Sequence, residues 1–526
     1  MIDSNDYFDA STQFLRSPEA IRGALFSAGA TEQAEAYRLM TRVAEAFKAA
    51  GGRALMVGGS VRDLILGEVF HDLDLEVYGL SADDVEFIAS RFGEVGTVGK
   101  AFAIVKLVAE GVDIDLALPR RDNKVDAGHR GFEVVADPHL SPEEAARRRD
   151  FTINAIAADP LTGAIIDPFN GLADLEAGLL RVVDAGTFIE DPLRVLRAVQ
   201  FVARFNLDVE PATFNLLKSM IPSLAELAPE RIGGEWRKLL LQAAQPSLGL
   251  TLAFNLGVIE SLHPELFALK ATPQEPEWHP EGDVWIHTLM VIDEAAKIVW
   301  QSGLGSERAL TVMLGALCHD FGKPAVTQVE NGRLRSHGHE EAGEAPTRSF
   351  LAKLYIGSDI TEAVVGLVRD HMKPFRYWCD DTQKNKPITD GAIRRLAVRI
   401  DPGTITELAL VAEADYFGRG PFNSPPAMGE AEGARIFAAG PWLTARAGAL
   451  GVLTSPPPHL LRGQELLDLG FPPGPLLGRL IKLADLLRDE HELNHFTIIS
   501  SLKSLPLTPA GGRDIASAIT QLESLA

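Results

Sequence analysis

The spacing of apolar and polar residues has two different periodicities along the chain, and the change between them falls near residue 160. Residues 35–50 carry apolar side chains at the spacing of an amphipathic helix. Helix-like segments separate four later runs that are typical of strands. These runs are RALMVGG (53–59), DLDLEVYG (72–79), AFAIVKLV (101–108) and VDIDLALP (112–119). The alternation predicts an α/β head over residues 34–165, after a weakly structured lead-in at 1–33.

The remainder of the chain shows almost only helical spacing. Residues 166–270 predict a helical neck, and the Pro-rich stretch ATPQEPEWHPEG (271–282) indicates a joint. A second helical domain is expected over 279–425, and a loop-rich stretch then leads into a tail at 426–526. The pattern therefore predicts a multidomain α+β protein with an α/β head followed by helical parts.

Composition narrows the classes of protein that fit. A net charge of −22 disfavours a protein that coats nucleic acid by bulk charge, although it leaves room for a local basic groove. The two cysteines, Cys318 and Cys379, cannot form a disulfide framework, which favours a reducing cytoplasm. The polar, acidic first residues do not match a secretory signal, and the longest apolar run is far shorter than the ~18 residues of a membrane span. We therefore expect a cytoplasmic protein that does not bind membranes.

Acidic residues recur at every second position in two of the predicted strands. Because strand side chains alternate between faces, Asp72, Asp74 and Glu76 share one face of the first of these strands. Neighbouring carboxylates repel unless a cation lies between them, and Mg²⁺ is usually held by one or two carboxylates plus substrate phosphates. Asp113 and Asp115 share a face in the same way. If the two strands are neighbours, Asp115 supplies a third carboxylate that helps to deprotonate an attacking hydroxyl.

A Gly-Gly turn precedes the first acidic strand. Gly58 and Gly59 follow a strand and open a helix-like run, so backbone N–H groups there can approach an anion closely. Ser60 lies in the same turn, and Arg62, one helical turn further on, could reach the same phosphates. A Gly-Gly turn alone is common, and alternating aspartates alone are usually a solvated strand face. Their combination favours metal-assisted phosphoryl or nucleotidyl transfer.

These motifs resemble a known family. GGSVRDLILG…HDLDLEVYG is similar to the signature of class II nucleotidyltransferases of the polymerase β superfamily, which includes bacterial CCA-adding enzymes and poly(A) polymerases. The similarity continues through RRDFTINA (148–155), DPFNGLADLEAGLLRVV (167–183) and EDPLRVLRAVQFVARF (190–205). It implies a polymerase-β-like head in which Asp72 and Asp74 hold Mg²⁺. The implied reaction adds CMP and AMP, from CTP and ATP, to the 3′ end of tRNA.

The resemblance also implies how the nucleotide is bound. Arg149 and Asp150 would support the nucleotide, with Asn154 nearby, although a cap or local hydrogen bond explains Asn154 equally well. Asp191 and Arg194 would read the Watson–Crick edge of the base. The charged segment 120–150 would be a mobile loop that helps the switch from CTP to ATP.

The base-reading residues lie in a pattern with one departure from the family. Positions 191, 194, 197 and 200 recur every three residues, which predicts a stripe on one helix face. Arg197 would face the triphosphate. The family usually has another Arg where this chain has Gln200, so we expect weaker triphosphate binding or compensation by Arg204. An ordinary surface Asp–Arg pair remains the alternative for positions 191 and 194.

A second group of chemically active residues lies in the second helical domain. Imidazoles and carboxylates together suit a transition metal or Mg²⁺, and an adjacent His-Asp pair in an apolar helix is costly unless its groups are satisfied. The order of these residues resembles the HD phosphohydrolase superfamily, although a single buried His is usually only a core residue. The resemblance implies four ligands to a divalent metal of unknown identity: His287, His319, Asp320 and Asp415. His339 and His371 would be additional ligands or phosphate contacts.

The order of domains resembles CCA-adding enzymes of some bacteria that carry a fused HD domain. There the domain implies 2′,3′-cyclic phosphodiesterase and phosphatase activity, which would repair tRNA 3′ ends. Residues 461–480 resemble the family's tail, which would help to hold the RNA. The expected partners are thus the tRNA 3′ end, CTP and ATP, with no DNA.

Three alternatives remain open from the sequence. The first is a poly(A) polymerase, or an enzyme that adds only CC or only A. The second is an HD phosphohydrolase with a degraded transferase head. Gln200, which departs from the family's usual Arg, is the feature that supports this alternative. The third is a pure RNA-binding module, which the complete carboxylate sets disfavour.

Overall fold

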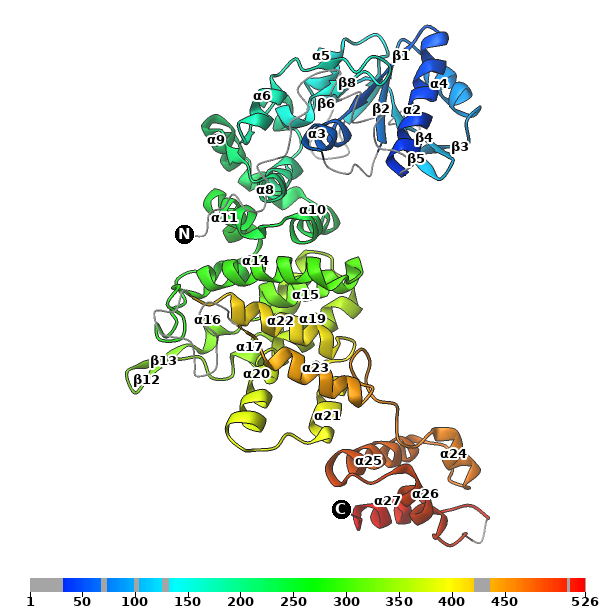
Figure 1. The fold of residues 1–526 in the computed structure, drawn as a ribbon, viewed down its shortest axis with the longest axis vertical. Helices are drawn as coiled ribbons and strands as arrows, with labels where there is room; N and C mark the ends of the chain where they lie inside the picture. The colour runs from blue at the N-terminus through cyan, green and yellow to red at the C-terminus, as the bar shows by residue number, and fades with distance from the viewer. Residues whose placement is uncertain are drawn as a thin grey trace. The chain divides into compact units, whose positions relative to one another are not determined.

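The computed structural model describes residues 32–67, 73–98, 104–124, 132–420, 436–508 and 511–525. The chain forms two compact units, Met1–Glu235 with Leu248–Leu262 and Trp236–Ser247 with His263–Ala526 (Figure 1). The predicted lead-in lies almost entirely outside the described residues, as does most of the loop-rich stretch after residue 420. The finer domain boundaries expected from the sequence stay predictions.

A seven-stranded mixed sheet forms the centre of the first unit. The strand order across the sheet is β3 (Glu94–Val98), β4 (Ile104–Ala109), β5 (Val112–Ala117), β2 (Leu73–Tyr78), β1 (Arg53–Val57), β8 (Ala157–Ala158) and β9 (Ile165–Ile166). Strands β2 and β5 pair in parallel, whereas the other neighbours pair antiparallel. The four predicted strands are confirmed as β1, β2, β4 and β5, and β2 and β5 are direct neighbours in the sheet.

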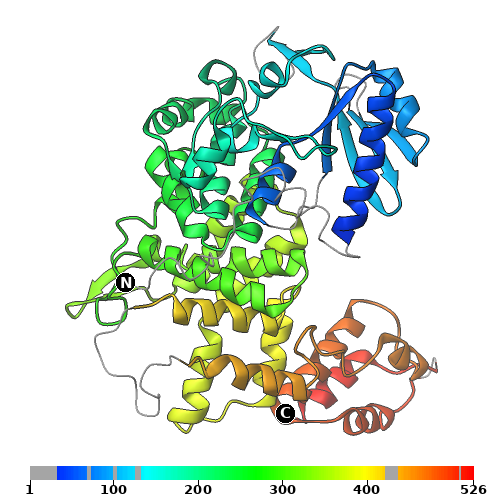
Figure 2. The same ribbon diagram turned by 45° about the horizontal axis from the view of Figure 1, so that its top comes forward.

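Helices cover the sheet because each has one apolar face. Helix α2 (Glu32–Ala49) was expected from its spacing and packs against β1 and β5 through buried residues such as Tyr37, Val43 and Phe47. It also contacts α4 (Ala82–Ala89), and the dark blue helix in Figure 2 lies along the strands. Helix α3 (Gly59–Leu66) packs against β1 and the short 3₁₀ turn η1 (Thr152–Asn154). The glycine turn is therefore anchored on the sheet.

The described parts of segment 120–150 have regular secondary structure, whereas residues 125–131 lie outside the described residues and the expected mobility stays a prediction. Strands β6 (Arg120–Lys124) and β7 (Phe132–Ala136) form an antiparallel hairpin, and α5 (Pro142–Ala146) follows. Helix α5 begins with a capping box in which Ser141 and Glu144 satisfy each other's backbone N–H groups. The capping signal is present in the sequence, but the charged strand β6 has no apolar alternation that would have predicted it.

Helices make up most of the rest of the first unit, as the sequence predicted. They are α6 (Gly171–Glu176), α7 (Ala185–Phe188), α8 (Leu193–Phe205), α9 (Pro211–Ser219) and α12 (Val258–Leu262), while α10 (Pro229–Gln242) and α11 (Pro246–Leu256) each contribute residues to both units. Phe151 packs edge-on against Phe188 and Phe201, with ring centroids 5.4 and 5.8 Å apart. This aromatic cluster holds α7 and α8 against the residue that precedes η1.

The second unit is helical around an apolar core. Its helices are α13 (Pro264–Phe267), α14 (Val284–Ser302), α15 (Ser306–Cys318), α16 (Lys323–Val326), α17 (His339–Ala342), α18 (Glu344–Lys353), α19 (Ser358–Asp370), α20 (Lys373–Trp378), α21 (Asp390–Ile400), α22 (Ile405–Phe417) and α23 (Ala439–Ala449). Fully buried Val312, Leu367 and Leu408 bring α15, α19 and α22 together. The hairpin of β12 (Gln328–Glu330) and β13 (Arg333–Arg335) interrupts this helical pattern and was not predicted. The joint at 271–282 contains no helix or strand, as expected.

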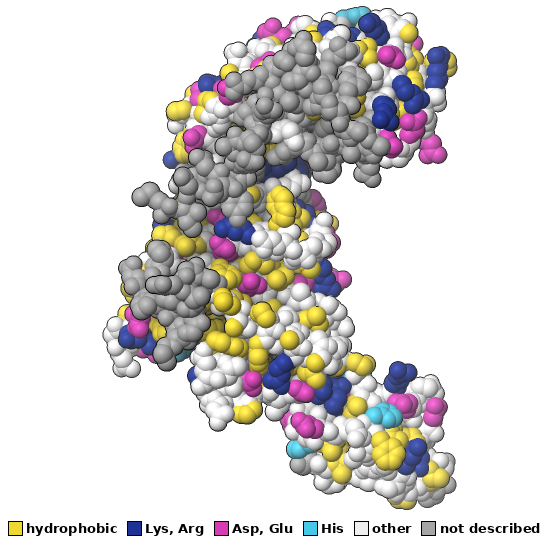
Figure 3. Space-filling view, viewed as in Figure 1, with side chains coloured by type: hydrophobic (Ala, Val, Ile, Leu, Met, Phe, Trp, Pro, Cys, Tyr) yellow, Lys and Arg dark blue, Asp and Glu magenta, His cyan; other side chains and the backbone are white. Residues whose placement is uncertain are grey.

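The C-terminal helices have a core of their own. Four helices, α24 (Gly463–Asp468), α25 (Pro475–His491), α26 (His495–Lys503) and α27 (Ile515–Glu523), pack through buried Leu466, Leu480, Ile498 and Leu522. Figure 3 shows apolar, acidic, basic and histidine side chains intermingled on the visible face of this part. Its RNA-holding role stays a prediction. None of the helices in the described ranges has both the length and the apolar content needed to cross a bilayer.

His263 gives the second unit a testable pH dependence. Its ring is 1% exposed, Trp236 Nε1 donates to its Nε2 at 3.2 Å, and burial lowers its pKa from 6.5 to about 3. His263 therefore binds a proton below about pH 6.5 in the unfolded chain, but only below about pH 3 in the folded chain. The contribution of neutral His263 to the stability of the fold is complete above pH 6.5 and is lost as the pH falls from 6.5 toward 3. The loss reaches about 2 kcal/mol at pH 5.

The measurement is urea unfolding at pH 7.5 and pH 5, followed by tryptophan fluorescence. We expect His263→Leu to have a smaller loss of stability between these pH values than the unmodified chain. Exposed His491 offers the matched control, because His491→Leu should leave the pH dependence unchanged. Equal pH dependence in His263→Leu and the unmodified chain would show that His263 does not titrate as described.

Candidate active sites

Two acidic residues lie side by side in the head sheet. Asp74 on β2 and Asp115 on β5 are register partners in the parallel pair. Ile114 and Leu116 are buried while Asp115 is exposed, so the expected alternation of faces is present. The condition that the two strands be neighbours is thus met. Asp72 lies just before β2, outside the described residues.

The glycine turn lies beside the Asp74 carboxylate. Gly58 precedes α3 with φ 74° and ψ −139°, a conformation that residues with a side chain rarely adopt. A Cβ atom on Gly58 would lie 3.2 Å from Arg149 Nη1 and 3.8 Å from Asp74 Oδ2. Any side chain at position 58 would therefore enter the space that the turn, Arg149 and Asp74 share.

Glu76 shares the face of Asp74 but is buried, not part of an open carboxylate row. Tyr78 Oη donates to Glu76 at 2.7 Å, and Arg148 Nη2 donates to it at 3.1 Å. Arg149 Nη2 lies 3.8 Å away. Burial alone would raise the pKa of Glu76, but the charges of Arg149 and Arg148 bring it below its usual value. Glu76 therefore anchors the two arginines of the RRD motif.

Asp150 is the centre of a buried polar network. Arg197 Nε donates to Asp150 at 2.6 Å, Asn154 Nδ2 at 3.0 Å and the Phe151 backbone N–H at 2.8 Å. Burial raises the pKa of Asp150, yet Arg197 and these hydrogen bonds outweigh it and hold the pKa below its usual value. Arg62 Nη1 donates to Asn154 Oδ1 at 2.5 Å. The network links α3, η1 and α8 into one support.

Ser60 and Arg62, both expected to bind the nucleotide, are engaged with protein groups. Ser60 Oγ donates to the Val57 carbonyl at 3.1 Å. Arg62 is 3% exposed, donates to Asp63 at 2.8 Å and lies over the Phe205 ring at 4.3 Å. These contacts favour positioning roles, and phosphate contact by either side chain stays a prediction.

Asp191 and Arg194, the predicted base-reading pair, lie at the start of helix α8. The expected helical stripe is only partly right, because α8 begins at Leu193 and Asp191 precedes it. Asp191 accepts from the Leu193 backbone N–H at 3.1 Å and from Arg231 Nη2 at 3.1 Å. No sequence signal pointed to Arg231, because the pair spans 40 positions. The reason for the error is that Pro192 occupies the N-cap position, so Asp191 lies one residue before the helix.

Arg194 is held by two backbone carbonyls. Its Nη1 donates to Thr187 O at 2.8 Å and its Nη2 to Arg148 O at 2.7 Å. A guanidinium has five N–H donors, and these two carbonyls use two of them. The base-reading role stays a prediction.

Gln200 and Arg204 are bonded to each other. Gln200 is 1% exposed, and its Oε1 accepts from Arg204 Nη1 at 3.2 Å. Gln200 Nε2 has no hydrogen-bond partner among the residues the structure describes. The expected compensation by Arg204 stays a prediction, although the two side chains are in contact.

The structure brings the four predicted HD ligands together in the second unit. They come from α14 (His287), the end of α15 (His319 and Asp320) and α22 (Asp415), and none is more than 6% exposed. His287 Nε2 lies 3.1 Å from Asp415 Oδ1 and 3.2 Å from His319 Nε2. His319 Nε2 lies 3.1 Å from Asp320 Oδ2.

The two auxiliary histidines form a neighbouring group with Asp320. His339 Nε2 lies 3.4 Å from His371 Nε2 and 3.5 Å from Asp320 Oδ1. Asp320 therefore presents one oxygen to each group. The charges of His319 and Lys323 overcome the effect of burial and keep the pKa of Asp320 well below its usual value.

Backbone contacts determine which nitrogen of three of these histidines is available. In each ring Nδ1 lies 2.7–2.8 Å from the carbonyl oxygen three residues earlier, and so carries the proton. The pairs are His319 with Ala316, His339 with Ser336 and His371 with Val368. Their Nε2 lone pairs then face one another and the carboxylates, which is unfavourable without a cation. This donor set fits divalent transition metals.

A cavity of about 340 Å³ adjoins the histidine cluster. Its lining includes the cations Lys323, Arg335, Arg376 and Arg419, together with exposed Trp278 at 52%. Glu275, Asp320 and Asp415 also line the cavity, and Lys323, Arg376 and Arg419 form ion pairs with carboxylates, so the charge of the lining is mixed. The sequence did not predict a role for His279 and Glu281, because they lie in the Pro-rich stretch 271–282, whose composition indicates a joint.

Family models match three parts of the chain. Residues 54–181 match the poly A polymerase head domain, 206–270 match a probable RNA and SrmB-binding site of polymerase A, and 284–419 match the HD domain. The Bacillus stearothermophilus CCA-adding enzyme in complex with CTP has a similar fold, with a TM-score of 0.60 and 20% identity. That match covers 93% of this chain and 98% of the solved one.

Curated relatives extend this result. The multifunctional CCA protein of Xanthomonas campestris pv. campestris (strain B100) is 38% identical over 373 residues, or 69% of this chain and 85% of the relative. The protein of the same name from Xylella fastidiosa (strain 9a5c) is 35% identical over 381 residues, or 70% of this chain and 84% of the relative. With its nucleotidyltransferase head and HD domain, the chain belongs to the family of multifunctional CCA proteins.

Proposed function

We propose that this chain is a tRNA nucleotidyltransferase that adds CCA, transferring CMP and AMP from CTP and ATP and releasing pyrophosphate. The observation that carries the proposal is the pairing of Asp74 with Asp115 beside the Gly58 turn. Two carboxylates next to a turn that can admit a triphosphate suit nucleotidyl transfer. The names of the curated relatives support the same reaction.

Each head residue then has a defined task. Asp74, with Asp72, would hold Mg²⁺, which when bound neutralises charge on the phosphates. Asp115 would accept the proton of the attacking 3′-hydroxyl. The backbone N–H groups of the Gly58–Gly59 turn would contact phosphate oxygens. Asp191 and the remaining donors of Arg194 would select the base.

In the HD domain we propose hydrolysis of terminal phosphates on tRNA 3′ ends, including 2′,3′-cyclic phosphates. His287, His319 and Asp415 would form one ligand group and His339 and His371 the other, with Asp320 shared. The group fits two divalent ions, which when bound activate a water as nucleophile. The cations among the residues that line the cavity would contact the phosphate.

A tRNA transcript that lacks its CCA end tests the head reaction. Incubation with CTP and ATP should lengthen the transcript by two CMP and one AMP, as read by mass spectrometry. Omitting ATP should stop the product after the two CMP residues. A product without CMP would contradict full CCA addition, and a long run of AMP would identify a poly(A) polymerase.

Two further expectations remain predictions. The absence of a DNA substrate and a cytoplasmic location both derive from the sequence alone. Both cysteines, Cys318 and Cys379, are buried and unpaired by disulfides in the structure, which agrees with a reducing compartment.

A further inference from the structure

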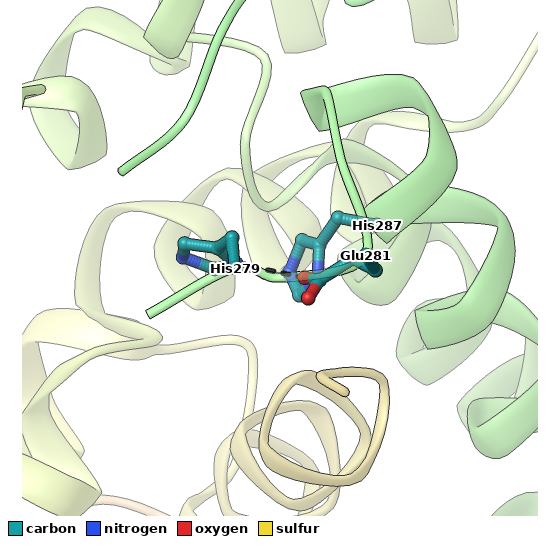
Figure 4. Close-up of side chains that lie close together, drawn as sticks. All are labelled: His279, Glu281 and His287. Carbon is teal, nitrogen blue, oxygen red and sulfur yellow. Dashed lines mark hydrogen bonds and ion pairs between the residues drawn. The ribbon is translucent and has the colours of Figure 1, made fainter. Parts of the chain in front are cut away.

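The segment before α14 places a carboxylate against a predicted metal ligand. Glu281 Oε1 lies 2.9 Å from His279 Nδ1 and 3.0 Å from His287 Nδ1 (Figure 4). Its other oxygen accepts the Gly420 backbone N–H at 3.2 Å. The Glu281 side chain is only 1% exposed. A buried carboxylate requires such partners, and this one has three.

The same three side chains could in principle hold an ion of their own. His287, however, directs its other nitrogen, Nε2, toward His319 and Asp415. A histidine that binds cations through both nitrogens must lose its last ring proton. If Nδ1 keeps that proton, beside the Glu281 carboxylate oxygen at 3.0 Å, Nε2 is left with a lone pair for the HD centre. The order of groups is that of a carboxylate–histidine–metal arrangement, with a close charged contact between Glu281 and His287.

His287 differs from the other three histidines in how its ring is held. Those rings contact the carbonyl three residues earlier. For His287 that carbonyl belongs to Val284, and it already accepts Thr288 Oγ1 at 2.8 Å. Glu281 therefore takes the place of the carbonyl. A carboxylate partner makes the ring a stronger electron donor than a carbonyl does.

We infer that Glu281 is a positioning residue, which fixes the tautomer and orientation of His287 for the HD metal centre. Through the same oxygen it also holds His279, whose ring lines the adjoining cavity. The segment that looked like a linker is thus one wall of the HD site. This inference rests on the metal centre proposed above.

Metal binding by the full-length chain tests the inference directly. The chain is stripped of metal and titrated with Co²⁺, with affinity read by calorimetry, ligation by the visible absorption of Co²⁺, and bound ions per chain by elemental analysis. Glu281→Gln should weaken Co²⁺ binding by about 10- to 100-fold, because it removes the charge behind His287. The number of ions bound at saturation should equal that of the unmodified chain. Glu281→Asp, with a shorter reach but the same charge, should fall between the two.

The chain contains a matched control. Glu275 lies on the same segment and lines the same cavity, but it accepts the Leu334 backbone N–H at 2.9 Å and contacts none of the six predicted ligands. Glu275→Gln should leave Co²⁺ affinity unchanged. CCA addition by the head in the same samples reports whether each variant chain is intact.

Three results would overturn the inference. Unchanged affinity in both Glu281 variants would show that the carboxylate does not act on the centre. One ion fewer at saturation in Glu281→Gln would make Glu281 a ligand itself. If the unmodified chain binds no Co²⁺, the proposed metal centre fails, and the positioning role fails with it.

Discussion

Asp74→Asn should reduce CMP and AMP incorporation into tRNA by about 1,000-fold, the loss of several kcal/mol of transition-state stabilisation. The substitution keeps the size of the side chain but removes the charge that would hold Mg²⁺ beside the phosphates. Asp74 is on a central strand paired with β1 and β5, so its position is rigid. The protein should remain folded, because the Asp74 side chain is only half-buried and is not part of the apolar core.

Asp113 provides the matched control for this loss. It lies two residues from Asp115 on β5, is 58% exposed and binds Lys106 Nζ at 2.8 Å. Asp113→Asn should therefore change incorporation less than about twofold, since surface ion pairs contribute little. Incorporation is measured with radiolabelled CTP on a transcript lacking CCA. Substantial activity in Asp74→Asn would refute the proposed transferase site.

Asp320→Asn should lower the rate of phosphate release by the HD domain about 1,000-fold. The rate of CCA addition should stay unchanged. Asp320 has one oxygen near His319 and the other near His339, so a single amide disrupts both ligand groups. It also removes the partner of buried Lys323, which lies 2.7 Å away. Release of phosphate from an oligonucleotide with a 3′-phosphate and ring opening of a 2′,3′-cyclic phosphate measure the loss.

His337 is the control within the same cavity. It lines the cavity but is 76% exposed and lies outside both ligand groups. His337→Ala should keep hydrolysis within about threefold, in the range of surface substitutions. If Asp320→Asn hydrolyses both phosphate substrates at the rate of the unmodified chain, the proposed HD site is wrong.

The two variants together test whether the chain carries two independent activities. Asp74 and Asp320 belong to different compact units. Asp74→Asn should therefore spare hydrolysis, and Asp320→Asn should spare nucleotide addition. Loss of both reactions in the Asp320→Asn variant would point to a general folding defect.

Short-range patterns were sufficient for much of the fold. The alternation in β2 and β5 and the helical spacing of α2 are local features, so they could be predicted before the structure. The predicted HD ligands came from the resemblance of their order along the chain to the HD superfamily, and the structure brings these side chains together. The sequence did not predict hairpin β6–β7, because the residues of β6 are charged or polar and only pairing with β7 defines that strand.

The amino-acid order sets which residues stand on each element and how they are spaced, and this was enough to predict the alternating aspartates and the glycine turn. The HD residues were predicted from a family resemblance. Contacts between distant segments depend on packing. Only the folded chain shows that Glu76 is buried against Arg148, that Asp191 pairs with Arg231, and that Glu281 lies against His287. The alternation of acidic and apolar residues along a strand is the same whether the carboxylate is exposed to solvent or buried against other side chains. The neighbours that tertiary folding brings to each carboxylate decide whether it faces a substrate or anchors another side chain.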